Sequence, residues 1–311
     1  MTYHPSRLSH PPRFSLSSFA HNHWYCGLRL ALLFCFAWNA AYSSLTAQQA
    51  IKLTEGLTFL AGFDGSADAS FSLGDAKVYH AKSLNLKDPV AGLPTDVVQL
   101  STDGKYGGCL KFGKRSEVFT FYRGEKNVAY NAEAMSGTVS LWMKLDPQKD
   151  LEPGFVDPLQ ITDKAWNDSC LFLDFTKDET PRHFRLGVFS DYKYWNPQDT
   201  PWDNIAVADR PMIVMEKPTF SAERWTHVAF VWRNFNTQKS SAELYLDGTS
   251  IGTFDKPQRI TWDPSKLAVI PGIYYSGWMD ELAIWSRALS AAEIQALNSE
   301  PAGLNAQIKR K

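Results

Sequence analysis

The segment from Gly277 to Trp285 constrains the fold of this chain more than any other stretch. Its apolar residues alternate as in a β-strand, and Asp280 falls on the same face as Leu282 and Ile284. A carboxylate on a buried face must be paired, hydrogen-bonded or bound to a metal ion. Asp280 therefore either accepts hydrogen bonds from neighbouring backbone at the end of the strand, or serves as a hard oxygen ligand of the kind calcium prefers.

A short helix is expected directly after this strand. Ser290 and Glu293 have the spacing of a capping box, which predicts a helix that begins after Ser290 and runs to about Leu297. The chain then becomes polar and ends in Lys-Arg-Lys, so we expect residues 301–311 to form a flexible tail.

Residues 55–289 consist of short strand patterns separated by clusters of Gly, Pro, Asn and Asp, as in a β-sandwich or barrel. Residues 225–232 are apolar on both faces, which predicts a central strand covered on both sides. Asp247-Gly248 supplies the positive φ angles of a two-residue hairpin turn. Residues 171–175 and 184–189 are expected to be consecutive strands. No repeat or linker interrupts the pattern, so residues 48–300 are interpreted as one domain.

The first 47 residues have the pattern of a signal peptide. Arg7, Arg13 and Arg29 precede or enter the apolar run 28–41, and small residues follow it up to Ala47. An uncleaved N-terminal anchor is the alternative. Either way we expect the domain to be exported, as a secreted, periplasmic or cell-surface protein.

The charge and the aromatic content of the chain indicate which kinds of binding partner to expect. The formal net charge is -1, which favours neither nucleic acid nor an anionic membrane surface, so beyond the signal segment no membrane contact is expected. The chain has 11 tryptophans, and aromatic side chains serve all-β proteins both in the core and in ligand stacking.

Two of the four cysteines lie in the predicted signal segment, which leaves Cys109 and Cys170 in the domain. In an exported protein these two residues form either one disulfide or two free thiols, and their spacing does not decide between the two.

Three blocks, in order, resemble the bacterial laminin-G-like domains of the concanavalin A-like lectin/glucanase superfamily. They are residues 104–112, the pair 225–229 with 244–248, and residues 278–294. The resemblance implies an all-β fold, a two-sheet antiparallel jelly-roll sandwich with a short C-terminal helix. It also implies a structural calcium ion between the first strand and an aspartate of the last strand, for which Asp64 and Asp280 are the matching residues.

The resemblance does not extend to a catalytic motif. The laminarinase-type glucanases of this superfamily carry Glu-x-Asp-x-x-Glu on one strand, and that pattern is absent here. The nearest approach, Asp174 with Asp178 and Glu179, is interpreted as solvated loop charge. His227, at a position where the resembling domains also carry histidine, is interpreted as structural. We therefore expect the protein not to be an enzyme.

The loop 191–204 is the segment most similar to a ligand-binding surface, because it is long for a hairpin connection and rich in aromatic and amide side chains. Aromatic rings stack on the apolar faces of sugars, while Asn and Asp bind hydroxyl groups. Alternatively, these rings fold the loop onto the sandwich. The candidate ligand-binding residues are Tyr192, Tyr194, Trp195, Asp199, Trp202, Asp203 and Asn204.

These observations together predict a secreted, non-catalytic, lectin-like protein that binds a glycan or polysaccharide and has a structural calcium site. One alternative is a structural or adhesion protein whose aromatic surface binds another extracellular protein. A second alternative is a glycoside hydrolase of the same superfamily whose catalytic groups are scattered along the sequence.

Overall fold

The computed structural model describes residues 53–309, so the predicted signal segment 1–47 lies outside the described part of the chain. Within residues 53–309, no helix is both long enough and apolar enough to cross a membrane.

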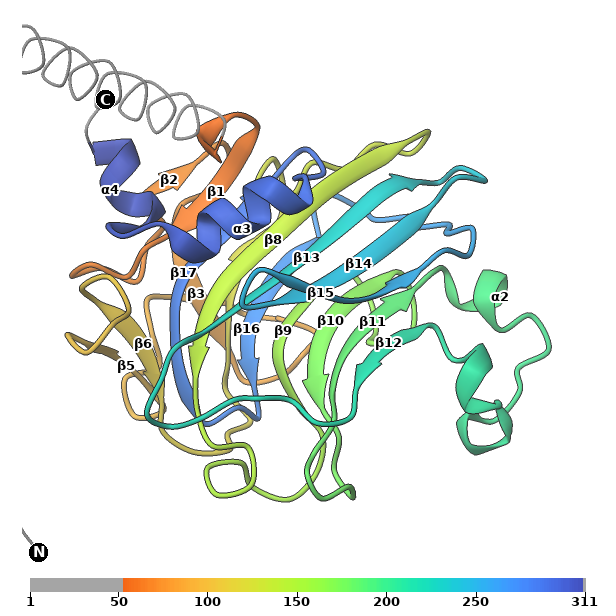
Figure 1. Cartoon of the computed structure of the whole chain (residues 1–311), viewed down its shortest axis with the longest axis horizontal. Coiled ribbons are helices and arrows are strands. Elements are labelled where there is room, and N and C mark those ends of the chain that lie inside the picture. The colour runs from red at the N-terminus through yellow and green to blue at the C-terminus, as the bar shows by residue number, and fades with distance from the viewer. Residues whose placement is uncertain (1–52, 310–311) are drawn as a thin grey trace, which may run out of the picture. The chain divides into compact units, whose positions relative to one another are not determined.

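The first of two antiparallel sheets has nine strands, seven of which follow one another along a single path (Figure 1). A short pair extends this sheet beside the first half of β17, where β6 (Cys109–Phe112) contacts β17 and β5 (Val98–Ser101) contacts β6. The strands along the path are, in spatial order, β15 (Thr249–Phe254), β14 (Ser241–Leu246), β13 (Thr226–Phe235), β8 (Met135–Lys144), β17 (Gly277–Trp285), β1 (Leu57–Ala61) and β2 (Phe71–Ser72).

The second sheet has eight strands and packs face to face with the first. Its strands are, in spatial order, β12 (Met212–Met215), β11 (Phe184–Phe189), β10 (Cys170–Phe175), β9 (Val156–Thr162), β16 (Ala268–Ile273), β7 (Phe119–Arg123), β3 (Val78–Ala81) and β4 (Val90–Ala91). The predicted all-β, two-sheet antiparallel jelly-roll sandwich is therefore confirmed.

One continuous apolar core fills the space between the sheets. Strand alternation builds it: Leu141 and Met143 of β8 face Leu171 and Leu173 of β10 across this layer. The strand β13 is buried on both faces between β14 and β8, as its sequence predicts. The hairpin at Asp247-Gly248 and the antiparallel pairing of β10 with β11 are also confirmed.

The two ends of the domain lie side by side in the first sheet. Strand β1 pairs with the second half of β17, with Phe59 opposite Ile284 and Ala61 opposite Leu282. The Trp285 indole adds a hydrogen bond of 2.7 Å to the carbonyl oxygen of Leu53. The first and last strands of the described domain therefore close the sheet together.

Two helices cover part of the outer face of the first sheet (Figure 1). The helix α3 (Ala291–Ser299) begins with the predicted capping box of Ser290 and Glu293, and its Ile294 and Leu297 are buried against that face. The outer face of the second sheet is covered only in part, where the short helix α2 (Tyr192–Trp195) packs Trp195 against Phe189.

The C-terminal segment corrects the prediction of a flexible tail at 301–311. Gly303–Lys309 form the helix α4, whose Leu304 packs into the apolar cluster on the first sheet. Glu281 explains this docking, because its carboxylate accepts the backbone N–H groups of Leu304 (2.8 Å) and Asn305 (2.9 Å) at the start of the helix. The sequence of the tail does not show this partner, because Glu281 lies on β17, 23 residues before Leu304.

The two domain cysteines are free and buried, so the disulfide alternative is not realised. Cys109 lies in β6 of the first sheet, whereas Cys170 lies in β10 of the second sheet and packs with Phe172 and Phe189. The sandwich places the two thiols in separate layers, which their sequence spacing did not indicate.

The contact between Glu281 and α4 makes a testable prediction. Glu281→Ala leaves two buried N–H groups without an acceptor, so the free energy of unfolding should fall by about 1–3 kcal/mol in urea titrations. The exposed Glu125→Ala serves as the matched control and should change stability by less than about 0.5 kcal/mol. Equal stability of the two variants would show that α4 does not depend on this carboxylate.

Candidate functional site

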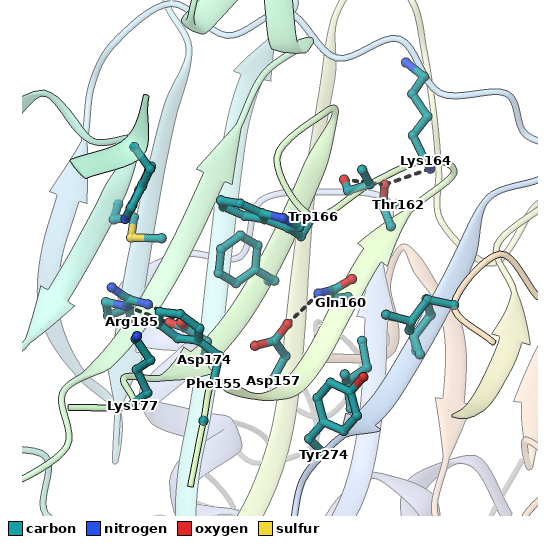
Figure 2. A pocket seen from close by; sticks show the side chains of 18 of the residues that line it. Phe155, Asp157, Gln160, Thr162, Lys164, Trp166, Asp174, Lys177, Arg185 and Tyr274 are labelled. Carbon is teal, nitrogen blue, oxygen red and sulfur yellow. Dashed lines mark hydrogen bonds and ion pairs between the residues drawn. The ribbon is translucent and has the colours of Figure 1, made fainter. Parts of the chain in front are cut away.

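A cleft of about 810 Å³ lies on the outer face of the second sheet (Figure 2). This volume is within the range of small-ligand sites, which is about 300–1,000 Å³. The strands β9, β10, β11 and β16 supply its floor, and the loops at both ends of these strands supply its walls. Its floor is seven residues long at β9, which corresponds to about 20 Å of extended chain.

A β-bulge brings Asp157 into this cleft. Between Leu173 and Phe175 the pairing of β10 with β9 shifts register, since β9 advances by three residues while β10 advances by two. Asp157 and Gln160 therefore face the same side although they are three residues apart, and the Gln160 amide donates a hydrogen bond to the Asp157 carboxylate. Strict alternation would have placed them on opposite faces.

Beside Asp157 the floor contains a buried ion pair. Asp174 on β10 lies directly opposite Arg185 on β11, and both Asp174 oxygens accept from this guanidinium, one of them from Nε at 2.8 Å. Asp174 is almost fully buried. Its interpretation as solvated loop charge was wrong, because the strand continues through Asp174 and cross-strand pairing supplies the counter-ion.

The two floor carboxylates have different environments. Burial at the cleft floor raises the pKa of Asp157, and the negative charge of Asp174 raises it further. Burial also raises the pKa of Asp174, but the hydrogen bonds from Arg185 oppose this rise. The floor therefore presents Asp157 as a carboxyl group that holds its proton to higher pH than usual, next to a neutralised ion pair.

Aromatic rings form the walls of the cleft at both ends. At one end Trp166 and Trp202 meet edge to face, with ring centroids 5.9 Å apart, over the stacked pair Phe172 and Phe189. Phe155 and Tyr274 stand at the other end (Figure 2). Trp166 is 44% exposed, so its ring is available to a ligand.

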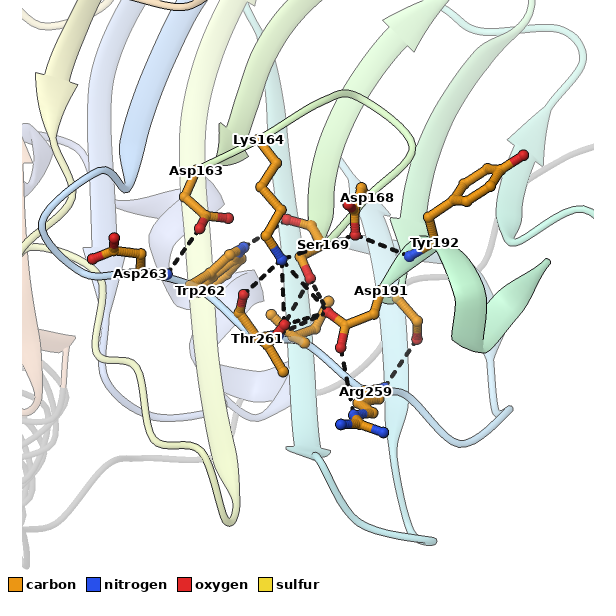
Figure 3. Close-up of polar contacts among 12 residues, drawn as sticks. Asp163, Lys164, Asp168, Ser169, Asp191, Tyr192, Arg259, Thr261, Trp262 and Asp263 are labelled. Carbon is orange, nitrogen blue, oxygen red and sulfur yellow. Dashed lines mark hydrogen bonds and ion pairs between the residues drawn. The ribbon is translucent and has the colours of Figure 1, made fainter. Parts of the chain in front are cut away.

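A polar network holds the tryptophan end in place (Figure 3). Asp191, at the start of the long loop, accepts hydrogen bonds from the hydroxyl of Ser169 and from Thr261. The Trp262 indole donates to the carbonyl oxygen of Ser169 at 2.6 Å, and Asp168 accepts the backbone N–H of Tyr192 at 2.9 Å. Three loops that are distant in the sequence are thereby joined under Trp166 and Trp202.

Only one of the predicted ligand-binding residues, Trp202, lines this cleft. The half-buried Trp195 packs edge to face on Phe189, at 5.0 Å between ring centroids, and donates to the carbonyl oxygen of Asn167. Trp195 thus anchors the loop to the sandwich, as the alternative interpretation of this segment expects.

The remaining predicted residues lie away from the cleft. Tyr192, in the short helix α2 (Tyr192–Trp195), donates its hydroxyl to Asp199, and Asp199 lies 3.8 Å from Lys193. Tyr194 lines a smaller pocket of about 320 Å³ between α2 and the loops around residues 236 and 259. Asp203 and Asn204 are exposed in the 3₁₀ turn η1 (Trp202–Asn204) and do not line the cleft.

Asp64 and Asp280, the predicted calcium ligands, both contact the turn at residues 106–108. Asp280 accepts the backbone N–H of Tyr106 at 3.0 Å, and Asp64 accepts that of Gly108 at 2.9 Å. Gly107 between them has φ 111° and lies against Asp64, where a Cβ would approach the carboxylate oxygen to 2.4 Å. The two carboxylates therefore fix this turn to the first and last strands.

These residues do not fit a calcium site. Calcium requires about six to eight oxygen ligands, whereas each oxygen of Asp64 and Asp280 is approached by an N–H donor, whose positive end repels a cation. Among residues 53–309, no three His, Cys, Asp or Glu side chains converge in a way that could hold a metal ion. The geometry matches the other interpretation of Asp280, an acceptor of backbone hydrogen bonds.

His227 has a serine partner that the sequence did not suggest. Its Nε2 lies 2.8 Å from Oγ of Ser140 on the neighbouring strand, but both residues are buried. Burial lowers the pKa of His227 to about 4, and its Nδ1 contacts no carboxylate in the described chain. Without access or an orienting acid, this pair is a structural contact.

The sequence reasoning missed most of the cleft, namely Asp157, Gln160, Asp174 and Arg185 on its floor and Phe155 and Tyr274 on its wall. A usable signal was present in 170–175, where Asp174 interrupts an otherwise apolar strand two residues before Thr176. The alternation of Asp174 with Phe172 and Cys170 places the acid on a face that is apolar yet separate from the core.

The sequence matches the model of one protein family. The family model Laminin_G_3, described as the concanavalin A-like lectin/glucanases superfamily, matches residues 125–295, which is more than half of the chain. No curated protein matches the sequence.

Solved structures show the same fold at low sequence identity. The binding domain of botulinum neurotoxin DC in complex with SialylT has a TM-score of 0.55 and 13% identity, covering 80% of this chain and 52% of that one. The botulinum neurotoxin serotype D ligand binding domain in complex with N-acetylneuraminic acid has a TM-score of 0.53 and 12% identity, covering 81% and 52%. This chain thus spans about half the length of those toxin domains.

Another similar structure is domain 4 of AbnA, an extracellular arabinanase from Geobacillus stearothermophilus, in complex with arabinotriose. It has a TM-score of 0.48 and 15% identity, covering 77% of this chain and 96% of that one.

The contacts of Asp280 predict how the domain responds to calcium. Asp280→Asn places an amide N–H₂ or a weaker acceptor against two backbone donors, so the free energy of unfolding should fall by about 1–3 kcal/mol. Calcium or a chelator should leave the melting temperature of the wild-type protein unchanged. A calcium-dependent rise of several degrees that disappears in Asp280→Asn would instead establish the metal site implied by the family resemblance.

The raised pKa of Asp157 predicts a pH-dependent stability. Above pH 4 the unfolded chain releases this proton while the folded chain keeps it, so the contribution of Asp157 to stability falls as pH rises toward its folded-state pKa. Asp157→Asn removes the titration, and its stability relative to wild type should improve between pH 5 and 8, by at most about 1.4 kcal/mol per pH unit. Parallel pH profiles of unfolding for the two proteins would contradict the raised pKa.

Proposed function

This chain belongs to the Laminin_G_3 family of the concanavalin A-like lectin/glucanases superfamily, and we propose that it binds a carbohydrate in the cleft on the outer face of its second sheet. The observation that carries this proposal is the combination of exposed aromatic walls with a polar, hydrogen-bonding floor. Trp166 offers an exposed ring on which a sugar can stack, and Trp202 lines the cleft beside it with Arg210 over its ring at 4.5 Å. Gln160 and Asp157 offer hydrogen-bonding groups for the sugar hydroxyls. The toxin domains of the same fold were solved with sialyl ligands, which supports a sugar as the ligand class here.

The dimensions of the cleft favour an oligosaccharide over a single sugar. The tryptophan pair and the Phe155–Tyr274 pair stand at opposite ends of a floor about 20 Å long. A single sugar ring would contact one end only, whereas a chain of several sugars would reach both aromatic walls. Binding energy would then be distributed over two stacking sites joined by the polar floor.

The floor favours binding without catalysis. Glycoside hydrolysis in most families needs two carboxyl groups that both reach the scissile bond. Asp174 is buried and both its oxygens are held by Arg185, so Asp157 is the floor carboxyl group left to contact a ligand. One accessible acid with a raised pKa can donate a hydrogen bond to a sugar, but it lacks the partner for hydrolysis.

Export of the protein is part of the proposal. The arginine-flanked apolar run 28–41 and the small residues before Ala47 support a signal segment that delivers the domain out of the cytoplasm. A glycan-binding domain would meet polysaccharides there. The cleft contains no free cysteine that an oxidising compartment would modify, since both domain thiols are buried.

The proposed function predicts distinct effects for three aromatic substitutions. Trp166→Ala and Trp202→Ala should each weaken glycan binding at least tenfold, because each removes a stacking face worth about 1–3 kcal/mol by analogy with base stacking on aromatic side chains. Tyr194→Ala, in the smaller pocket, is the matched control and should bind as the wild type does.

A glycan array followed by titration calorimetry on the full chain would measure these affinities, with a parallel assay for released reducing ends. Binding without release supports the proposed function. Release of reducing ends would replace it with the hydrolase alternative. Absence of binding to every glycan would leave the protein-binding alternative.

A further inference from the structure

Positive charge gathers at the Phe155 end of the cleft, although the chain as a whole has a formal net charge of -1. Arg115, Lys177 and Arg185 all line this end, and the rings of Phe155 and Tyr274 lie among them. The Arg185 guanidinium and the Lys177 ammonium lie 5.6 Å from the centroid of the Phe155 ring, on the cleft side of the sheet (Figure 2).

Arg115 is held in place without a counter-ion. Its guanidinium carbon lies 3.7 Å from the centroid of the Tyr274 ring, a stacking contact that fixes the plane of the group. One nitrogen, NH1, makes only long contacts of 3.4 Å to the carbonyl oxygens of Pro153 and Phe155. Within residues 53–309 this side chain makes no ion pair with a carboxylate, and the hydrogen bonds that its guanidinium donates to the protein come from NH1 alone.

The acidic groups nearby pair with two of these three basic side chains and leave Arg115 without a counter-ion. Asp174 is neutralised by Arg185, and Asp178, which pairs with Lys177 at 3.2 Å, is 73% exposed and outside the cleft. Glu117 and Glu152 approach the same end from neighbouring loops, but they accept the Tyr274 hydroxyl and the Arg115 backbone N–H and do not line the cleft.

Asp157 is the remaining acid that faces this end. Its pKa is raised by burial and by Asp174, so near neutral pH the carboxyl group holds its proton more often than an ordinary aspartate. The cleft therefore combines a guanidinium without a counter-ion, an ammonium whose partner Asp178 is solvent-exposed, and a weakly acidic floor, which is the charge pattern of an anion-binding site.

We propose that the cleft selects an anionic glycan, with a carboxylate or sulfate group of the sugar bound by Arg115 and Lys177 at the Phe155 end while the sugar rings stack on Trp166 and Trp202. This inference rests on the proposed function and specifies its ligand class. The planar, stacked guanidinium of Arg115 matches the two oxygens of a carboxylate, and Lys177 adds a flexible point charge.

The test uses pairs of ligands that differ only in charge. The full chain is titrated at low salt with oligogalacturonate and its methyl ester, and with a sulfated galactan oligosaccharide and its desulfated form. At least one anionic member should bind at least tenfold more tightly than its neutral partner, and this difference should shrink as salt is added. The pair that shows the difference identifies carboxylate or sulfate as the bound group.

Three variants assign the effect to the cleft. Arg115→Gln and Lys177→Gln should each lower the ratio of the affinity for the anionic member to the affinity for its neutral partner at least threefold. Lys114→Gln, at an exposed position next to Arg115 and outside the cleft, should behave as wild type. Melting temperatures show whether Arg115→Gln remains folded, and the exposed Lys177 keeps the test informative if it does not.

Two results would overturn the inference, and they are distinguishable. Equal affinity for the charged and neutral members of both pairs, with Trp166→Ala still weakening both, would leave glycan binding intact and reject the anion preference. Failure of all four oligosaccharides and of a panel of neutral glycans to bind would reject the proposed function together with the inference.

Discussion

The pairing of β1 with β17 determines which surface of this protein is free to bind a ligand. It joins the two ends of the domain in one sheet, and it carries the chain from β17 into α3 and α4 on the outer face of that sheet. Glu281 on β17 then holds the start of α4. One outer face is covered in this way, and the cleft lies on the outer face of the opposite sheet.

Within the cleft, one β-bulge positions the polar side chains of the floor. The register shift between β9 and β10 turns Asp157 toward Gln160, beside the ion pair of Asp174 and Arg185. A buried ion pair stabilises a fold only weakly after its desolvation is counted, so this pair is weak evidence for stability. The pair occupies one acid of the floor and leaves Asp157 as the floor carboxyl group that the proposed glycan would meet.

The sequence predicted the features whose signals are local. The hairpin at Asp247-Gly248, the capping box at Ser290 and the buried strand β13 each depend on residues adjacent in the chain, and all are confirmed. The sandwich itself followed from strand alternation and from the three blocks shared with laminin-G-like domains, and the family match bears this out.

Features that depend on tertiary contacts escaped prediction for physical reasons. A β-bulge leaves no mark in a pattern of period two, so Asp157 could not be assigned to a face. The helix α4 is short and is held by a carboxylate on a distant strand. In the loop 191–204 aromatic content alone could not separate Trp202, which lines the cleft, from Trp195, which anchors the loop.

The most direct test of the account is hydrogen–deuterium exchange of the full chain with and without a bound oligosaccharide. Glycan binding in the cleft should slow exchange in the peptides that cover β9, the loop 163–169 and the loop 152–155, with no change in α3 or α4. Protection centred on α3, α4 or the smaller pocket near Tyr194, with the cleft peptides unchanged, would contradict it.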